Sequence, residues 1–521
     1  MGKDRMRKLA TSRWVTLGTV LLIALAALNI ACNKKSATSA TGTTQMSEKT
    51  GRAEAGVLPA SSWVVPEDVK PSNGVSPSQS DWENFGWQTF VAINWPSATP
   101  SAAGISGLPN TQLTIGASSS NGAMIPAVWG TFRSENNTML AAAQDPGPWS
   151  NNPVPIPSGC AALTSSNPVS PGFQPVVFAM ISKFGNVNQA SGPPLIEQSG
   201  WYVTYDIRLD QSEYTYLQQN GYYNGATQQS VESKSGQLLP IPRTGQEAMF
   251  NPPLPVLAQY GALEAKTAWR VLDPQKDQAI IPRYFTQWGY FLQQDGTTCQ
   301  GPTLFGLIGL HILRLTPTTP ATWFWATFEQ VDNVTAPPGG ASATLAAANT
   351  PNGNCTAQDN VPPPIPSQNI PWNGTAKPVT NVCQVTNISS SVLQINQNWQ
   401  GNLAGTVWQY YQLIDTINPS VTGGPQYPIP VTNSNVNTNI LANTTMETYV
   451  QGAGPGNGQS CMDCHGYATP QGAQQNANNQ VFSFLFSNAN APAGVNAAYR
   501  KRPLPRNVQR ILQNMQSRSK K

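Results

Sequence analysis

Histidine is almost absent from this 521-residue chain. Only His311 and His465 occur, and the sequence has no second copy of its one CxxC pair. A structural zinc site takes four Cys or His ligands, so these counts argue against zinc. The chain also lacks internal repeats, a glycine-rich phosphate loop and a nucleophile elbow. Repeat architectures, P-loop nucleotide binding and α/β-hydrolase chemistry are therefore not expected.

The two cysteines of the CxxC pair and one histidine form the run CMDCH at residues 461–465. This spacing is that of covalent haem c attachment, in which two thiols reach two vinyl groups of one porphyrin and the adjacent imidazole binds the iron. A thioredoxin-like dithiol is the alternative, but it expects a βαβ context and leaves the histidine without a role. We expect one haem, held by Cys461 and Cys464, with His465 as the proximal axial ligand.

Residues 1–31 have the pattern of an export signal. Basic residues precede an apolar stretch from Trp14 to Ala31. The run LNIAC at 28–32 resembles a bacterial lipobox, in which Cys32 is lipidated and becomes the first residue, although Asn29 stands where the motif usually has Leu. An uncleaved anchor is the alternative, since a stretch of about 18 residues is just long enough to span a bilayer. We expect the periplasmic side of a bacterial membrane, as an outer membrane lipoprotein.

The cysteine count agrees with export, because disulfides form in oxidising compartments. Seven cysteines occur, and three are assigned above to lipid and haem. The other four allow two disulfides with three possible connectivities, which the sequence does not resolve. We favour Cys355 with Cys383 and Cys160 with Cys299. Four buried thiols are the alternative.

Composition divides the chain into five parts: a signal peptide (1–31), a flexible tether (32–58), a β-rich body (59–438), a haem attachment segment packed on the body (439–498) and a basic tail (499–521). Residues 1–31 hold five Lys or Arg and one Asp, so their removal takes the net charge from +4 to zero. The tail is basic without any acid, so the body is acidic. The tail either pairs with the body, touches anionic lipid, docks an acidic redox partner or is a solvated end. Nucleic acid is not an expected partner.

With 46 Pro and 43 Gly, the sequence predicts an α+β, β-rich fold with a large antiparallel sheet core, long loops and few helices. Helices are expected over 80–94, with Ser80 as N-cap, over 439–450 and over 506–515. Strands are expected over 201–209, 263–272, 283–292, 304–315, 322–331 and 406–417, the fourth and fifth joined by a turn at 316–320. Trp323 and Trp325 are expected in the sheet core rather than in a groove.

The second axial position of the iron needs a ligand from upstream, because the one Met after the motif, Met515, lies in the tail. His311 is the first candidate, in an apolar run whose alternation groups it with Gly309 and Leu313. It is either an iron ligand, a core histidine bonded to a backbone carbonyl, or a distal acid–base group. Met446 is the weaker candidate, and helix packing is its other explanation.

Seven blocks of the chain carry a resemblance. They are ENFGWQTFVAINWP (84–97), AVWGTF (127–132), LEAKTAWRVL (263–272), GLIGLHILRLTP (306–317), TWFWATFEQVDN (322–333), NTTMETYVQ (443–451) and SCMDCHGYA (460–468). Together they resemble a poorly characterised group of bacterial cytochrome c family proteins, often predicted lipoproteins. The resemblance implies export and covalent haem but no substrate. That group often has His where this chain has Gln330, which leaves His311 as the shared histidine.

The sequence therefore predicts a membrane-anchored single-haem cytochrome that transfers electrons to an unidentified redox partner protein. A haem enzyme of peroxidase or oxygenase type, with an open distal site, is the first alternative. A surface binding protein in which haem is incidental is the second.

Overall fold

The computed structural model describes residues 58–59, 61–100, 106–149, 158–161, 169–179, 189, 193–235, 240–247, 250–251, 253–293, 295, 297–319, 323–347, 355–362, 379–385, 387–418, 441–451, 461, 465, 468–471, 481–490 and 492. The expected signal peptide and most of the tether, with Cys32, lie outside these residues. Cys464, the basic tail and the helix expected over 506–515 lie outside them too.

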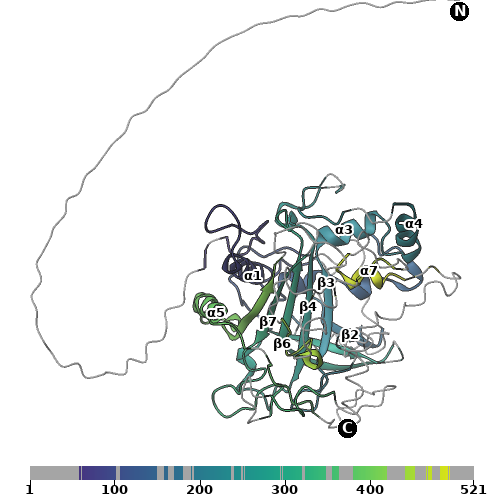
Figure 1. The fold of residues 1–521 in the computed structure, drawn as a ribbon. Helices are drawn as coiled ribbons and strands as arrows, with labels where there is room; N and C mark the ends of the chain where they lie inside the picture. Colours follow the sequence, from purple (N-terminus) through teal and green to yellow (C-terminus); the bar gives the residue numbers. More distant parts are fainter. Residues whose placement is uncertain are drawn as a thin grey trace, which may run out of the picture. The chain divides into compact units, whose positions relative to one another are not determined.

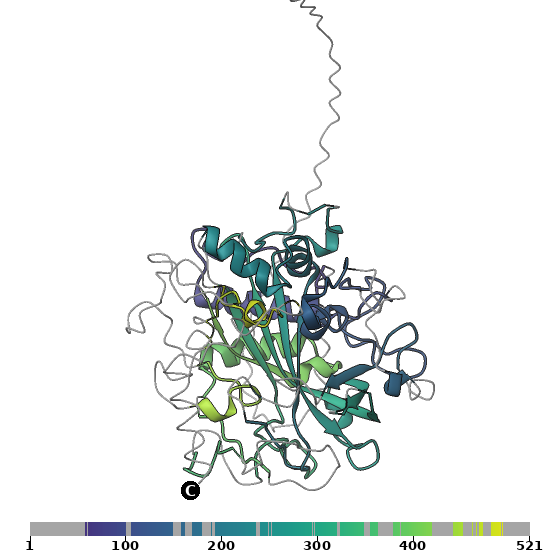
Figure 2. The same cartoon turned by 90° about the vertical axis from the view of Figure 1, so that its right-hand side faces the viewer.

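One eight-stranded sheet forms the centre of the described chain (Figure 1). Its strands are β1 (Arg133–Ser134), β2 (Val176–Ala179), β3 (Thr204–Leu209), β4 (Leu263–Leu272), β5 (Thr286–Leu292), β6 (Cys299–Arg314), β7 (Phe324–Gln330) and β8 (Tyr411–Ile417). The order is β1-β3-β4-β6-β5-β2, and β7 joins β6 to β8. Figure 2, seen from the side, shows the sheet curling into a half-barrel.

The long strand β6 organises this sheet. Its first half pairs with β5, its second half pairs with β7, and β4 runs along its other side. All pairs are antiparallel except β2 with β5, which are parallel. The sheet is therefore mixed, and the expected purely antiparallel core is corrected at this one edge.

Six α-helices accompany the sheet in the described residues: α1 (Gln79–Ile93), α2 (Ser158–Ala161), α3 (Gln211–Gln219), α4 (Gly225–Ser235), α5 (Ser390–Asn402) and α7 (Phe484–Ser487). Short 3-10 helices span Val128–Thr131, Glu135–Asn137, Ala141–Ala143, Val256–Ala258, Ile281–Arg283, Val407–Tyr410 and Thr448–Val450. The expected helix over 80–94 is confirmed as α1, but its N-cap is Ser78, whose hydroxyl and the Asp81 carboxylate form a reciprocal capping box.

The helix expected over 439–450 is wrong for the described residues 441–450, which form turns and end in the 3-10 helix Thr448–Val450. The strand predictions hold with shifted ends. β4 matches 263–272, whereas β6 begins at Cys299 rather than at residue 304, and residues 407–410 are 3-10 rather than strand. The expected hairpin is confirmed by the antiparallel pairing of β6 with β7.

One face of the sheet is apolar and is covered by α1 and α5. Phe324 and Phe328 of β7 point to this side, where Trp82 stacks on Phe324 and Phe90 stacks on Phe328 at a ring-centroid distance of 4.2 Å. Trp87 of α1 in turn stacks on Trp399 of α5. Such aromatic burial is the main stabilising term for this layer.

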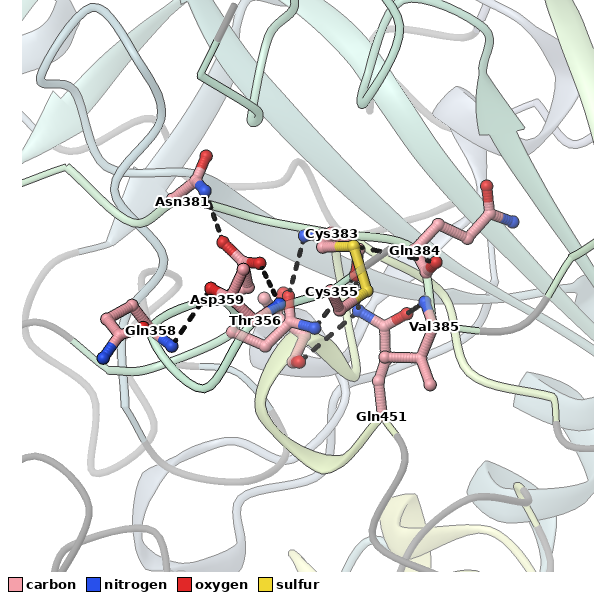
Figure 3. Close-up of a disulfide and its surroundings, with 11 residues drawn as sticks. Cys355, Thr356, Gln358, Asp359, Asn381, Cys383, Gln384, Val385 and Gln451 are labelled. Atoms are coloured by element: carbon pink, nitrogen blue, oxygen red, sulfur yellow. Dashed lines mark hydrogen bonds between the residues drawn. A yellow bond between two sulfur atoms is a disulfide. The ribbon is translucent and has the colours of Figure 1, made fainter. Parts of the chain in front are cut away.

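Both expected disulfides are present, Cys160 with Cys299 and Cys355 with Cys383. Disulfides are typical of proteins outside the cytoplasm. Figure 3 shows the second one, where the backbone carbonyl of Cys383 accepts hydrogen bonds from Asn360 Nδ2 (2.9 Å) and Gln451 Nε2 (3.3 Å). The disulfide therefore fixes the loop that holds Gln451, ten residues before the CxxCH motif. Among the residues described, no helix is both long and apolar enough to cross a bilayer.

Replacing Cys355 and Cys383 by Ala should lower the free energy of unfolding by about 3 to 4 kcal/mol, because the disulfide closes a loop with a sequence separation of 28. Urea denaturation measures this. As a control, dithiothreitol should cause a loss of the same size in a C160A/C299A background. Equal stability of the double variant and the wild type would contradict the prediction.

Candidate functional site

The second face of the sheet carries polar side chains in its middle. His311 of β6 lies opposite Lys266 of β4 and Thr327 of β7, and residues paired across antiparallel strands share a face. Two residues along, Glu264 and Trp325 flank Leu313, and in the other direction Glu329 lies opposite Gly309. We call the side chains of Glu264, Lys266, His311, Trp325, Thr327 and Glu329 the polar face.

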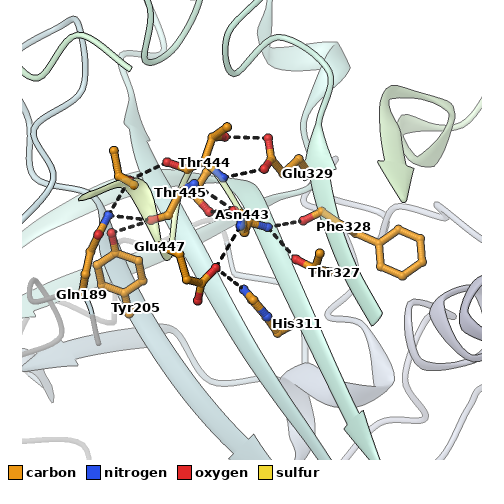
Figure 4. Close-up of polar contacts among 11 residues, drawn as sticks. Gln189, Tyr205, His311, Thr327, Phe328, Glu329, Asn443, Thr444, Thr445 and Glu447 are labelled. Atoms are coloured by element: carbon orange, nitrogen blue, oxygen red, sulfur yellow. Dashed lines mark hydrogen bonds and ion pairs between the residues drawn. The ribbon is translucent and has the colours of Figure 1, made fainter. Parts of the chain in front are cut away.

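Residues 443–448 lie on the polar face and supply its hydrogen-bond partners (Figure 4). Asn443 Nδ2 donates to Thr327 Oγ1 (2.9 Å), and Thr444 donates through both its N–H and its hydroxyl to the Glu329 carboxylate (2.6 Å each). On the far side, Tyr205 OH donates to the Thr445 carbonyl (2.8 Å). A buried polar group without a partner costs free energy. The turn and the polar face therefore stabilise each other by pairing their polar groups.

His311 is 5% exposed, and its Nε2 lies 3.3 Å from Glu447 Oε2. The contact has the distance of an ion pair without the angle of a hydrogen bond. Burial alone would raise the pKa of Glu447, but His311, Lys266 and the Asn443 N–H lower it below its ordinary value. Glu447 is therefore a carboxylate that faces the His311 imidazole, and this partner of Nε2 is a side chain rather than a backbone carbonyl.

His465 of the CxxCH motif is half-buried, and its Nδ1 lies 2.6 Å from the backbone carbonyl oxygen of Phe482. A carbonyl only accepts, so Nδ1 carries the proton and Nε2 keeps its lone pair. Burial, with smaller contributions from Lys266 and His311, lowers the pKa of His465 to about 4, although the Phe482 carbonyl and Glu447 act in the opposite direction. The imidazole is therefore neutral near pH 7, which is the form that binds a metal, and it lies within electrostatic reach of the polar face.

Aromatic rings surround His465. Its ring meets Trp325 at a centroid distance of 6.0 Å and Phe484 at 5.1 Å, both edge to face. Cys461, 8% exposed, belongs to the same apolar cluster as Trp325 and Phe482. His465 thus contacts Trp325 at the edge of the polar face, and Cys461 lies in the same apolar cluster.

These residues fit a covalently bound haem. A proximal imidazole whose Nδ1 donates to a backbone carbonyl has its Nε2 fixed for iron. The apolar cluster offers the dry surroundings that a porphyrin requires. The indole N–H of Trp325 is buried without a hydrogen-bond partner among the described residues. Buried donors are normally paired, so this N–H needs an acceptor.

The other predicted residues lie elsewhere. Met446 is fully buried in a second apolar cluster with Ile308 and Tyr449. Gln330 alternates to the face opposite His311 and donates to Asp332 Oδ2 (3.0 Å). In the described part of the chain, no three His, Cys, Asp or Glu side chains are grouped to hold a metal ion.

Sequence reasoning missed Glu447, Lys266 and Trp325 as parts of the site. A signal existed for Lys266, because it and Glu264 alternate with the apolar residues Leu263 and Ala265 at the start of the run LEAKTAWRVL. Nothing local marks Glu447, whose partner lies 136 residues away in the chain.

Comparison with known proteins adds no relative. The chain matches no protein-family model, no curated protein and no solved structure.

Gly309 permits the close approach of the 443–448 turn. A Cβ at this position would clash with Thr445 Oγ1, which is held by Asn443, and would lie 3.3 Å from Met446 Cε. G309A should therefore lower the free energy of unfolding by about 1 to 3 kcal/mol in urea denaturation. The matched control is G401A, an exposed helical position with nothing within 4 Å, which should be neutral or slightly stabilising. Equal effects of both variants would refute the close approach.

Glu264 of the polar face gives a pH-dependent prediction. Burial, with the nearby carboxylates of Glu135 and Asp210, raises its pKa to about 7. The folded state therefore holds a proton that the unfolded chain releases at lower pH, so stability falls as the pH rises from about 4.5 to 7. The loss is on the order of 3 kcal/mol.

E264Q should reduce this loss, measured as the free energy of unfolding in urea at pH 5 and pH 8. The exposed E67Q is the control and should follow the wild type. Parallel pH profiles for E264Q and the wild type would refute the assignment.

Proposed function

We propose that this chain is a membrane-anchored c-type cytochrome that holds one haem and transfers electrons outside the cytoplasm. The observation that carries the proposal is the CMDCH motif, together with a His465 imidazole whose Nδ1 donates to the Phe482 carbonyl. The resemblance to cytochrome c family proteins adds support. In this proposal Cys461 and Cys464 form the thioether bonds and His465 Nε2 binds the iron.

The bound haem supplies a one-electron redox centre. The residues of this chain hold it in place and keep water away. Trp325 and Phe484 contact the His465 ring edge to face, and Phe482, whose carbonyl accepts from His465, packs against Trp325. A fixed, dry surrounding limits the rearrangement that accompanies a change of charge on the iron, which suits electron transfer.

Export and anchoring belong to the same proposal. The lipobox at 28–32 would attach Cys32 to the periplasmic side of the outer membrane, and the two disulfides agree with an oxidising compartment. The redox partner is a protein that this chain meets at the membrane. The basic tail is one means of docking it.

A haem enzyme is the second candidate, and one observation favours it. The His311 imidazole, the other histidine near the motif, is held by the Glu447 carboxylate 3.3 Å away. An imidazole oriented by a carboxylate is suited to move a proton to or from a bound peroxide or oxygen. Under this candidate His311 is a distal acid–base group, whereas in an electron carrier it is the sixth ligand of the iron.

Carbon monoxide distinguishes the two candidates. An electron carrier with His311 on the iron should show a six-coordinate reduced spectrum that carbon monoxide leaves unchanged, and H311A should bind the gas. M446L is the control for the weaker ligand candidate and should behave as the wild type. If instead M446L binds carbon monoxide and H311A does not, Met446 is the ligand.

Rapid binding of carbon monoxide by the reduced wild type would contradict the carrier and support the enzyme. The enzyme candidate then requires peroxide-dependent oxidation of a dye that is lost in H311A. Absence of such turnover in the wild type would remove that candidate.

A further inference from the structure

Trp325 has a buried hydrogen-bond donor with no partner among the described residues. Its side chain is 1% exposed, and its indole N–H meets no acceptor among the described residues. Six other indole N–H groups do have acceptors, on Asn or Thr side chains or on backbone carbonyls: those of Trp87, Trp95, Trp129, Trp269, Trp323 and Trp399. A buried unpaired N–H costs about 1 to 3 kcal/mol, so the exception needs a cause.

Trp325 also lies beside His465 of the CxxCH motif. Its ring contacts the His465 imidazole and shares an apolar cluster with Cys461. In the described part of the chain one other buried indole N–H has no acceptor, that of Trp408, which packs between Phe285 and Phe90 in the core on the α1 side of the sheet. Both indole N–H groups are buried without an acceptor among the described residues, but only Trp325 lies beside the motif, so Trp408 is a suitable control.

A positive charge lies on the same face. Lys266 is half-buried on β4, and its ammonium acts electrostatically on both His465 and Glu447. Its Nζ lies 5.9 Å from the centre of the Tyr205 ring and has no ion-pair partner within 4 Å in the described part of the chain. A donor N–H and an ammonium on one face, next to the motif, are the groups that bind a carboxylate.

We propose that Trp325 and Lys266 bind a propionate carboxylate of the haem, the indole N–H by a hydrogen bond and the ammonium by its charge. The inference rests on the proposed function, because it requires a haem on His465. The propionates are the acceptors at the edge of the porphyrin, and each lies within a side chain's length of the ring that the motif holds. Trp325 and Lys266 are thus positioning residues, which orient the haem and stabilise the ionised propionate.

The test is the pH dependence of the midpoint potential of the full-length haem protein. Removing a donor from an ionised carboxylate raises its pKa, so W325F should move the propionate inflection up by about one pH unit. K266Q should move it in the same direction. W408F and the exposed K276Q are the matched controls and should leave it in place. Glu264, His311, Glu329 and Glu447 are the other ionisable side chains of this face; W325F and W408F change no charge, so the contribution of these groups is common to both variants.

If the propionate inflection of W325F fell at the same pH as that of W408F, the inference for Trp325 would be overturned. The same inflection pH in K266Q and K276Q would overturn it for Lys266. If W325F does not fold, K266Q at its half-buried position still carries the test. A wild type that contains no covalent haem would refute the proposed function itself. A haem-containing wild type with unshifted variants refutes only the propionate site.

Discussion

The polar face is the constraint on which the rest of this structure depends. A sheet buried on both sides is ordinarily apolar, yet β4, β6 and β7 place Glu264, Lys266, His311 and Glu329 toward one side. Leaving such groups buried without partners would cost several kcal/mol. The 443–448 turn lowers this cost by bonding to Thr327 and Glu329 and by placing Glu447 against His311. The turn is therefore fixed, and the segment that follows it starts from a defined point beside the sheet.

The two faces of the sheet differ: one is packed with aromatic side chains, and the other carries the residues of the candidate site. Aromatic rings of α1 and α5 fill the apolar face, where Phe90 and Phe328 stack. This layer holds the strands rigid, so that side chains on the opposite side are presented with little freedom. On that opposite side the site residues come from strands, while His465 comes from the C-terminal part and is oriented by the Phe482 carbonyl. Cys383, which forms a disulfide with Cys355, accepts a hydrogen bond through its carbonyl from Gln451, ten residues before the motif.

Sequence patterns predicted the parts of the fold in which local and tertiary preferences agree. β4 and α1 follow from a β-branched and aromatic run and from a capped amphipathic segment. The helix predicted over 439–450 was wrong because the side chains of Asn443 and Thr444 form hydrogen bonds with the sheet rather than supporting a helix. α4 was missed because its sequence, rich in Gln and Ser, shows little apolar periodicity, and α3 because its buried face includes the polar residues Ser212 and Glu213. In the site, the motif predicts which residues would bind a haem, but the contact of His311 with Glu447 depends on pairing across the fold, which no local pattern encodes.

The proposed function requires a covalent haem at residues 461–465. The most direct measurement is mass spectrometry of proteolytic fragments of the full-length protein recovered from the membrane fraction of a host that assembles c-type cytochromes. The account predicts that the fragment containing Cys461 and Cys464 carries the mass of one haem and that both cysteines resist alkylation. Recovery of that fragment without haem and with two alkylated thiols would contradict it.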